Sequence, residues 1–386
     1  MSDPTPIQQQ VFTLSWLASQ APTGQPYPAG GSGGDGSLTP WSPDDLQAAI
    51  NSLNGTIPGW EWDVVWGPGY AADWGGDSGT PSGEANAMFV VKQRNGDPVY
   101  VIAIAGTNMA SPFDLIEDMD TGPQSWNLKN PGTLKPQVTH GDWLGLSNLL
   151  GTSKDGKKIL DVVKGIPDKG NTTLWFTGHS LGGALSPMLM LALMDPDTDP
   201  KAVDTSQTRL GLWKQVNLLA TAGPSIGNQD FVTHFRKVFG ANNASTTFIW
   251  NGNDVVPHAW NYDTMKELTH PNIYGIDLPA NGCAAQKLAA AQNNATGGGK
   301  SYVMFERTPA FTFDLQQYTN PDAWTPDAKF FTQLGFQHLN AYVSHFGCSD
   351  WFPLPNAFGD AEAANDAAVE LCSPSKFKHT ELSAVG

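Results

Sequence analysis

The sequence predicts an α/β protein with a mostly parallel central sheet and helices on both of its faces. Three observations carry this prediction. The run VYVIAIA at residues 99–105 is apolar throughout, as in a strand that is buried on both faces. From there to residue 251, strand-like and helix-like segments alternate, which is typical of a parallel sheet covered by helices. The chain has 386 residues, of which 40% are hydrophobic, and is therefore long enough to bury a sizeable core.

The N-terminal part is predicted to form two helices. Residues 6–20 have the pattern of a short helix. The sequence SPDD at residues 42–45 begins the second helix, because it supplies an N-cap Ser, a Pro at the first helical position and two acids in the first turn. This helix is expected to end near Gly55. Residues 28–37, which are rich in Gly, are expected to form a flexible loop.

The elements of the sheet are expected to follow. Strands are predicted at residues 60–66, 87–93, 99–105, 172–177, 215–222, 245–251 and 301–315. Helices are predicted at residues 143–164, 181–194, 228–239, within 281–300, and at 338–346 and 359–371. The Asn-Gly at residues 95–96 indicates a hairpin between two of the strands. No clean linker interrupts the chain, so we expect residues 1–386 to form one domain.

The charge of the chain excludes several classes of partner. Lys and Arg number 21 and Asp and Glu number 37, which gives a net charge of −16. Such a chain is repelled by phosphate backbones and by anionic membranes, so nucleic-acid binding is not expected. The sequence shows no secretory signal and no apolar stretch near the ~20 residues of a transmembrane helix. We therefore expect a soluble protein, cytoplasmic or exported without a leader.

Cofactor and metal sites are not expected either. The Gly-rich segments lack the Lys-Ser/Thr of a phosphate-binding loop, and no His, Cys and acidic residues have the spacing of metal ligands. The three cysteines, Cys283, Cys348 and Cys372, are widely spaced and allow at most one disulfide, with three possible pairings. The expectation from this spacing is that they are buried or free thiols.

A strand–turn–helix motif at residues 174–184, LWFTGHSLGGA, indicates a nucleophile. G-x-S-x-G between a strand and a helix is the sequence of a nucleophile elbow. The sharp turn is expected to hold Ser180 in a strained backbone conformation, with its Oγ above the carboxyl end of the sheet. Gly178 and Gly182 would permit the close approach of strand and helix. The alternative is an inert Ser in a Gly-rich turn.

Three motifs in this order resemble those of a known family. They are the Ala-Gly-Thr that closes the strand at 99–105, then GHSLGG at residues 178–183, and then NGNDVVP at residues 251–257. Together they resemble the class 3 lipases, the fungal-type lipase family of the α/β-hydrolase superfamily. The resemblance covers roughly residues 60–260 and a His-containing segment near residue 338. It implies an α/β-hydrolase fold with lid and cap insertions.

The resemblance also implies roles for individual residues. Asp254 matches the acid of the family's Ser-His-Asp triad. Thr107 matches the residue that supplies one oxyanion-hole donor, and the backbone N–H of Leu181 would supply the other. The family usually has Arg at the position of Ala105, so a pairing behind the oxyanion hole is absent here.

The histidine of the triad must follow Asp254 in the order Ser, Asp, His. The candidates are His258, His270, His338, His345 and His379. His338 is favoured, because it stands in a loop that enters a helix, as the family's triad histidines do. His345 lies on the same helical face and is expected to be structural or solvent-facing. His258 resembles a family position that lines the site without being the base.

Two segments are expected to cover the site. Residues 108–135 are predicted to form a lid, because apolar residues alternate there with acids and the resemblance places a lid after the oxyanion strand. The alternative is an ordinary amphipathic helix packed on the core. Residues 259–330 lengthen the interval between Asp254 and His338 and are predicted to form an insertion or cap within the domain.

The sequence therefore predicts a serine carboxylic ester hydrolase with Ser180 as nucleophile, His338 as base and Asp254 as orienting acid. A lipase acting on triacylglycerols or other acyl esters, at a lipid–water interface, is the first prediction. A short-chain esterase and a phospholipase A1-type hydrolase use the same chemistry and are the alternatives among enzymes. Outside the enzymes, the alternative is a catalytically inactive, hydrolase-like binding protein.

Overall fold

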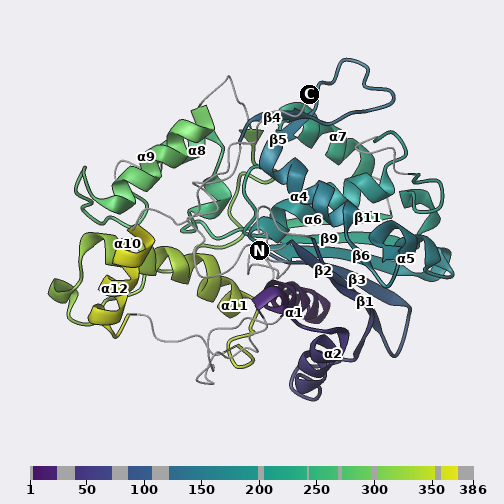
Figure 1. The fold of residues 1–386 in the computed structure, drawn as a ribbon, viewed down its shortest axis with the longest axis horizontal. Helices are drawn as coiled ribbons and strands as arrows, with labels where there is room; N and C mark the ends of the chain where they lie inside the picture. The colour runs from purple at the N-terminus through teal and green to yellow at the C-terminus, as the bar shows by residue number, and fades with distance from the viewer. Residues whose placement is uncertain are drawn as a thin grey trace.

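A computed structural model describes residues 3–23, 40–71, 86–106, 121–198, 204–240, 243–267, 272–296, 302–352 and 358–372. Within these residues the central sheet has six strands, in the spatial order β1 (Trp62–Tyr70), β2 (Ala87–Gln93), β3 (Val99–Ile104), β8 (Thr173–His179), β9 (Gln215–Thr221) and β11 (Ala244–Ile249) (Figure 1). The ladders β1–β2 and β2–β3 are antiparallel, whereas β3–β8, β8–β9 and β9–β11 are parallel. The predicted α/β fold is confirmed, with the predicted hairpin at one end of a mixed sheet.

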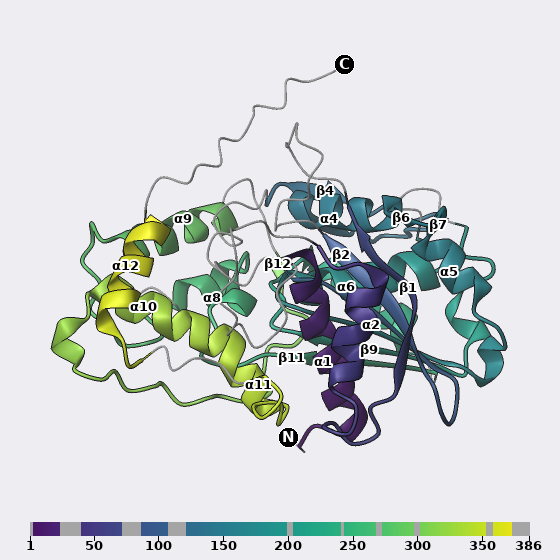
Figure 2. The ribbon, with the colours of Figure 1, turned by 60° about the horizontal axis from the view of Figure 1, so that its bottom comes forward.

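Helices cover both faces of this sheet (Figures 1 and 2). One face packs against α1 (Pro6–Gln20), α2 (Pro43–Ser52) and α11 (Ala341–His345), and the other against α4 (His140–Gly151), α5 (Ile159–Gly165), α6 (Leu181–Met194) and α7 (Gln229–Phe239). Alternate residues of β3 enter the two cores: Ile102 and Ile104 on the face of α6, and Val101 and Ala103 on the face of α1. An apolar run without alternation is therefore buried on both sides, as predicted.

Helix α1 lies beneath the middle of the sheet. A capping box between Thr5 and Gln8 begins it, and every residue from Gln10 to Gln20 is buried. The helix packs against β3 and β8, so it supports the strand that leads to Ser180. The sequence predicted the bounds of α1 correctly, but its helical pattern did not show that the helix is buried on all sides.

Beside the sheet lies a layer of four helices, α8 (Tyr262–Glu267), α9 (Cys283–Thr296), α10 (Pro326–Gly335) and α12 (Ala361–Cys372), seen in green and yellow in Figure 1. A small sheet, β12 (Tyr302–Val303), β10 (Gly227–Asn228), β5 (Gln137–Thr139) and β4 (Pro123–Ser125), borders the main one. Residues 259–330 thus contribute α8, α9 and the start of α10. Their role as a cap, like the assignment of a single domain, stays a prediction.

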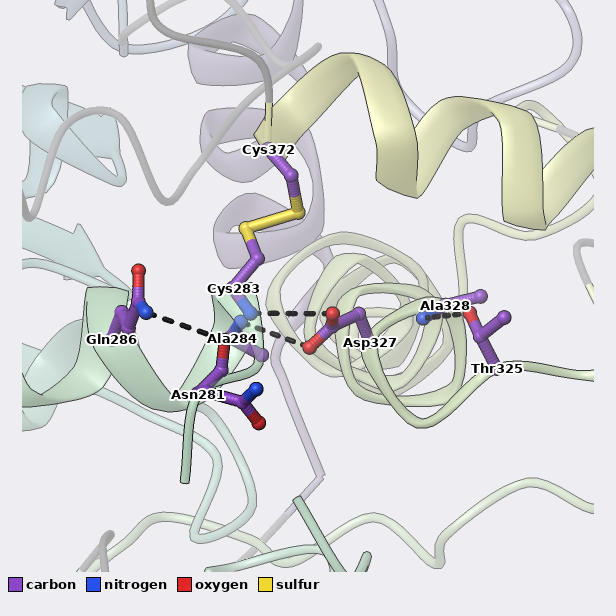
Figure 3. The surroundings of a disulfide bond; sticks show 8 residues. All are labelled: Asn281, Cys283, Ala284, Gln286, Thr325, Asp327, Ala328 and Cys372. Atoms are coloured by element: carbon purple, nitrogen blue, oxygen red, sulfur yellow. Dashed lines mark hydrogen bonds between the residues drawn. A yellow bond between two sulfur atoms is a disulfide. The ribbon is translucent and has the colours of Figure 1, made fainter. Parts of the chain in front are cut away.

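A disulfide joins two helices of this layer (Figure 3). Cys283 at the start of α9 is bonded to Cys372 at the end of α12, with 5.7 Å between their Cα atoms. Beside it, the Asp327 carboxylate accepts hydrogen bonds from the N–H groups of Cys283 and Ala284. The expectation of free thiols is therefore wrong for this pair, because folding brings together residues 89 apart in sequence. Cys348 is free and buried.

Opening this disulfide is expected to destabilise the protein by roughly 2–5 kcal/mol, because it closes a long loop in the unfolded chain. Urea unfolding of wild type and Cys372→Ser, each with and without dithiothreitol, measures the loss. Reductant should lower the stability of wild type to that of Cys372→Ser and leave the variant unchanged. Cys348→Ser, which keeps the disulfide, should still respond to reductant. A wild type that is indifferent to reductant would contradict the prediction.

Three predicted elements differ from the structure. The helix predicted at 143–164 is two helices, α4 and α5, separated by the hairpin β6 (Ser153–Lys154) and β7 (Lys157–Lys158). Its turn residues Asp155 and Gly156 both have positive φ, 52° and 75°, as Asp-Gly favours. The strand predicted at 301–315 is limited to β12, and the helix predicted at 338–346 continues a helical run that starts at Pro326.

Candidate active site

Ser180 stands at the turn between β8 and α6. Its backbone has φ 58° and ψ −125°, a left-handed conformation that is strained for a non-glycine residue, so the predicted strain is confirmed. Both neighbouring glycines are required. A Cβ at Gly178 would lie 2.1 Å from the carbonyl oxygen of Gly182, and one at Gly182 would lie 2.4 Å from that of Ile104. The tight turn leaves Ser180 5% exposed above the sheet.

Three predicted residues form a hydrogen-bonded line. His338 Nε2 lies 2.9 Å from Ser180 Oγ. On the other side of the ring, His338 Nδ1 lies 2.9 Å from Oδ2 and 3.1 Å from Oδ1 of Asp254. A carboxylate only accepts hydrogen bonds, so it retains the proton on Nδ1 and leaves the lone pair of Nε2 facing the serine hydroxyl. His338 and Asp254 are 1% and 0% exposed, so both side chains are shielded from bulk solvent.

The carboxylate of Asp254 has two further donors. The N–H of Val256 donates to Oδ1 at 3.0 Å, and the hydroxyl of Tyr342 donates to Oδ2 at 2.8 Å. Tyr342 in turn accepts from the N–H of Asn251 at 3.0 Å. Burial and the negative charge of Asp254 raise the pKa of Tyr342 well above its usual value, so it remains a donor. Tyr342 was not predicted, although its position four residues after His338 places it one helical turn away.

His338 is carried by a π-helical turn, Phe336–Asn340, between α10 and α11. Such turns inside helices are frequent at functional sites. The side-chain amide of Asn251 donates to the backbone oxygen of Gln337 at 3.0 Å and to its side-chain oxygen at 2.7 Å. The loop that follows β11 is thus tied to the turn that carries His338. The sequence predicted a loop entering a helix, whereas the residue lies within a continuous helical run.

The predicted oxyanion donors are described only in part. Leu181 is the first residue of α6, so its N–H has no acceptor within the helix. Thr107 lies outside the described residues. The preceding residue, Gly106, donates its N–H to the hydroxyl of Ser19 in α1 at 2.9 Å. Residues 107–120, which include the first part of the predicted lid, also lie outside the described residues, so the lid stays a prediction.

Two of the other candidate histidines, His258 and His345, are among the described residues and are not in this line. His258 is buried near Asp254 with its ring 5.3 Å from that of Trp250, and neither ring nitrogen has a hydrogen-bond partner in the described structure. Burial lowers the pKa of His258 to about 4, so its ring is neutral at pH 7. The ring of His345 stacks on Phe311 at 4.0 Å. His270 and His379 lie outside the described residues.

A second buried carboxyl, Asp142, lies in the first turn of α4. It is 0% exposed; its Oδ2 accepts a 2.5 Å hydrogen bond from Thr139, and its Oδ1 has no partner among the described residues. Burial raises the pKa of Asp142 to about 7. Between pH 4 and pH 7 the folded carboxyl stays protonated while the unfolded one ionises, so the free energy of unfolding falls as pH rises through this window.

Asp142→Asn is expected to remove this loss, which amounts to about 4 kcal/mol once pH exceeds 7. Urea unfolding at pH 4.5, 6 and 8 measures the dependence. The variant should gain stability over wild type as pH rises, with little difference at pH 4.5. Asp366→Asn, which removes an exposed carboxylate, is the control and should follow the wild-type curve. Parallel curves for Asp142→Asn and wild type would refute the prediction.

Among the residues that the structure describes, no helix is long and apolar enough to span a bilayer. In the same residues, no group of three or more His, Cys, Asp and Glu side chains is arranged to hold a metal ion.

Residues 101–263 match the family model described as Lipase (class 3). This part of the chain is similar to the class 3 lipases. The match contains most of β3, the Ser180 elbow and Asp254, and it ends before His338. On the basis of this match, the chain is a carboxylic ester hydrolase.

Solved structures of lipases are similar to the chain to different degrees. The M37 lipase superposes with a TM-score of 0.68 at 23% identity, over 94% of this chain and 99% of that chain. The lipase from Rhizopus microsporus var. chinensis has a TM-score of 0.42 at 14% identity, covering 66% of this chain and 70% of its own. Lipase II from Rhizopus niveus has a TM-score of 0.41 at 16% identity, covering 68% and 78%. The M37 match shows the α/β-hydrolase fold. No curated protein sequence matches the chain.

Proposed function

We propose that this hydrolase cleaves acyl esters through an acyl-enzyme on Ser180, with His338 as general base and acid and Asp254 as its orienting group. The observation that supports this assignment is the buried line from Ser180 Oγ through both ring nitrogens of His338 to the Asp254 carboxylate, with 2.9 Å at each step. The same order of nucleophile, base and acid activates serine in unrelated hydrolases.

The reaction has two halves. Ser180 Oγ attacks the ester carbonyl while its proton passes to His338 Nε2, and the carbonyl oxygen becomes an oxyanion that accepts from the N–H of Leu181 and from Thr107. The carbon–oxygen bond to the alcohol then breaks, and Nε2 gives its proton to the leaving oxygen. In the second half, water loses a proton to Nε2 and attacks the acyl carbon. The bond between the acyl carbon and Ser180 Oγ then breaks, the fatty acid leaves, and Nε2 returns its proton to Oγ.

Neutral acyl esters are the substrate class that we propose. The net charge of −16 opposes approach to an anionic phospholipid surface, whereas an uncharged acylglycerol surface carries no such penalty. This favours lipase over phospholipase A1-type activity. Hydrolysis of emulsified triacylglycerol should therefore exceed hydrolysis of phosphatidylglycerol vesicles at low salt, where the charge repulsion is least screened. Faster release of fatty acid from the vesicles would reverse this substrate assignment.

The mechanism is tested by titration with an alkyl p-nitrophenyl phosphonate, which forms a stable adduct with an activated serine. We expect one phosphonate per chain, located on Ser180 by peptide mass spectrometry, and loss of p-nitrophenyl ester hydrolysis in proportion to labelling. Ser180→Ala and heat-unfolded wild type should not be labelled. Labelling at another serine, or an active Ser180→Ala variant, would disprove the proposal, and a folded wild type that neither reacts nor hydrolyses esters would favour the binding-protein alternative.

A further inference from the structure

His179, the residue immediately before Ser180, is a buried polar side chain that the mechanism above does not use. It is 1% exposed and lies among aromatic rings. Its ring centroid is 6.1 Å from Phe12 and 5.6 Å from Trp16, both in α1, and 5.0 Å from Tyr342 in α11. Burying an imidazole in such apolar surroundings lowers the stability of the fold unless both of its nitrogens are hydrogen-bonded.

Both nitrogens of His179 have partners. Nε2 lies 2.9 Å from the backbone oxygen of His338, and Nδ1 lies 3.0 Å from the hydroxyl of Thr221. A carbonyl oxygen can only accept, so Nε2 carries the hydrogen and donates it to His338. In the neutral ring, Nδ1 then accepts from Thr221, whose single hydroxyl hydrogen is directed to Nδ1 at 3.0 Å in preference to the backbone oxygen of Gly178 at 3.2 Å. Burial, and then the neighbouring His338, lower the pKa of His179 well below its usual value, so this tautomer persists at neutral pH.

The hydrogen bond from Nε2 joins the two reacting side chains through their backbones. His179 is adjacent to Ser180 in β8, and its acceptor belongs to His338 itself. The preceding carbonyl in the π-helical turn, that of Gln337, accepts from Asn251. Two successive carbonyls of this turn are therefore held by side chains from neighbouring segments. A shift of about 1 Å between a nucleophile and its base can cost on the order of 10²-fold in rate.

We propose that His179 is a positioning residue for the active site: its Nε2–H holds the backbone of His338 at the distance from Ser180 that proton transfer requires. The rings of Phe12 and Trp16 in α1 pack against His179, so α1 helps to hold this positioning residue in place. This helix lies outside the segment that matches the lipase family model. The inference rests on the proposed function, because it takes His338 as the base.

Two substitutions separate the hydrogen bond from the packing. His179→Phe keeps an aromatic ring among its neighbours but removes the donor to His338. His179→Gln places an amide N–H near the position of Nε2. In p-nitrophenyl ester hydrolysis we expect kcat of His179→Phe to fall on the order of 10²-fold with KM unchanged. His179→Gln should regain most of that loss, and the melting temperatures should not follow the order of kcat.

Thr177→Val is the matched control. Thr177 lies two residues earlier in β8, is 0% exposed, and donates to the backbone oxygen of Leu219 at 2.9 Å without touching His338. It should lose stability while keeping kcat. A His179→Phe enzyme within about threefold of wild-type kcat, or a Thr177→Val enzyme that loses as much kcat, would overturn the inference.

If circular dichroism shows His179→Phe to be unfolded, the comparison passes to His179→Asn and His179→Gln. The shorter amide of Asn reaches only the side of Thr221, so its kcat should fall while that of Gln holds, and equal values would also overturn the inference. Failure of the proposed function is recognised separately, because Ser180→Ala would then retain wild-type activity.

Discussion

Replacing His338 by Ala is expected to lower kcat for p-nitrophenyl ester hydrolysis by about 10⁵–10⁶-fold, with KM changed little. The buried serine hydroxyl then has no acceptor for its proton, because the 2.9 Å contact with Nε2 is lost. Removing either the nucleophile or the base of such a unit costs nearly as much as removing both. The double variant Ser180→Ala/His338→Ala should therefore be no slower than either single variant, as measured by initial rates at saturating substrate.

His345→Ala is the control for this prediction. His345 lies seven residues on, at the end of α11, and its ring stacks on Phe311 at 4.0 Å instead of facing Ser180. Its removal should change kcat by less than about threefold, with a modest loss of stability. If His338→Ala kept most of its activity while His345→Ala or His270→Ala lost it, the assignment of the base would be wrong.

The local parts of the active site could be predicted from the sequence because short-range sterics determine them. In the G-x-S-x-G turn the backbones of Gly178 and Gly182 approach too closely for a side chain on either residue. The positive φ of Ser180 belongs to the same tight turn. Asp254 follows β11, and the carboxyl ends of neighbouring parallel strands lie at one edge of the sheet. Asp254 is therefore expected at the same edge of the sheet as Ser180, because both residues follow parallel strands.

The supporting contacts could not be predicted in this way, because they join distant residues. His179 bonds to a backbone oxygen 159 residues away, and Tyr342 bonds to a carboxylate 88 residues away. A backbone acceptor leaves no residue type to recognise in the sequence, and a buried Tyr in a helix resembles any core residue. The disulfide between Cys283 and Cys372 was missed for the same reason, since three pairings were equally open.

The errors in secondary structure have a more local cause. Residues 143–164 carry helical periodicity at both ends, and the Asp-Gly turn between them was not weighed against it. Residues 301–315 have a β-rich composition, but most of them do not pair with a neighbouring strand. Their backbone groups form isolated hydrogen bonds instead, such as the one that the N–H of Phe313 donates to the side-chain oxygen of Asn251. Composition without a neighbouring strand to pair with does not make a strand.

Asp254→Asn is expected to lower kcat by about 10⁴-fold while leaving the fold intact. The reason lies in the donors around the carboxylate. The N–H of Val256, which can only donate, faces Oδ1 and therefore requires the amide oxygen of Asn at that position. The amide NH₂ then takes the place of Oδ2, opposite His338 Nδ1. Nδ1 must accept, the ring proton moves to Nε2, and the base can no longer take the proton of Ser180.

Tyr342→Phe provides the graded comparison for this argument. It removes one donor to Oδ2 but leaves the charge and the acceptor for Nδ1–H in place, so kcat should fall only roughly tenfold, in keeping with the loss of one charge-assisted hydrogen bond. Stopped-flow release of p-nitrophenol measures acylation directly in both variants. Comparable rates in Asp254→Asn and Tyr342→Phe would mean that the carboxylate acts only through packing. A loss at least a hundredfold greater in Asp254→Asn would mean that its proton-accepting oxygens set the tautomer of His338.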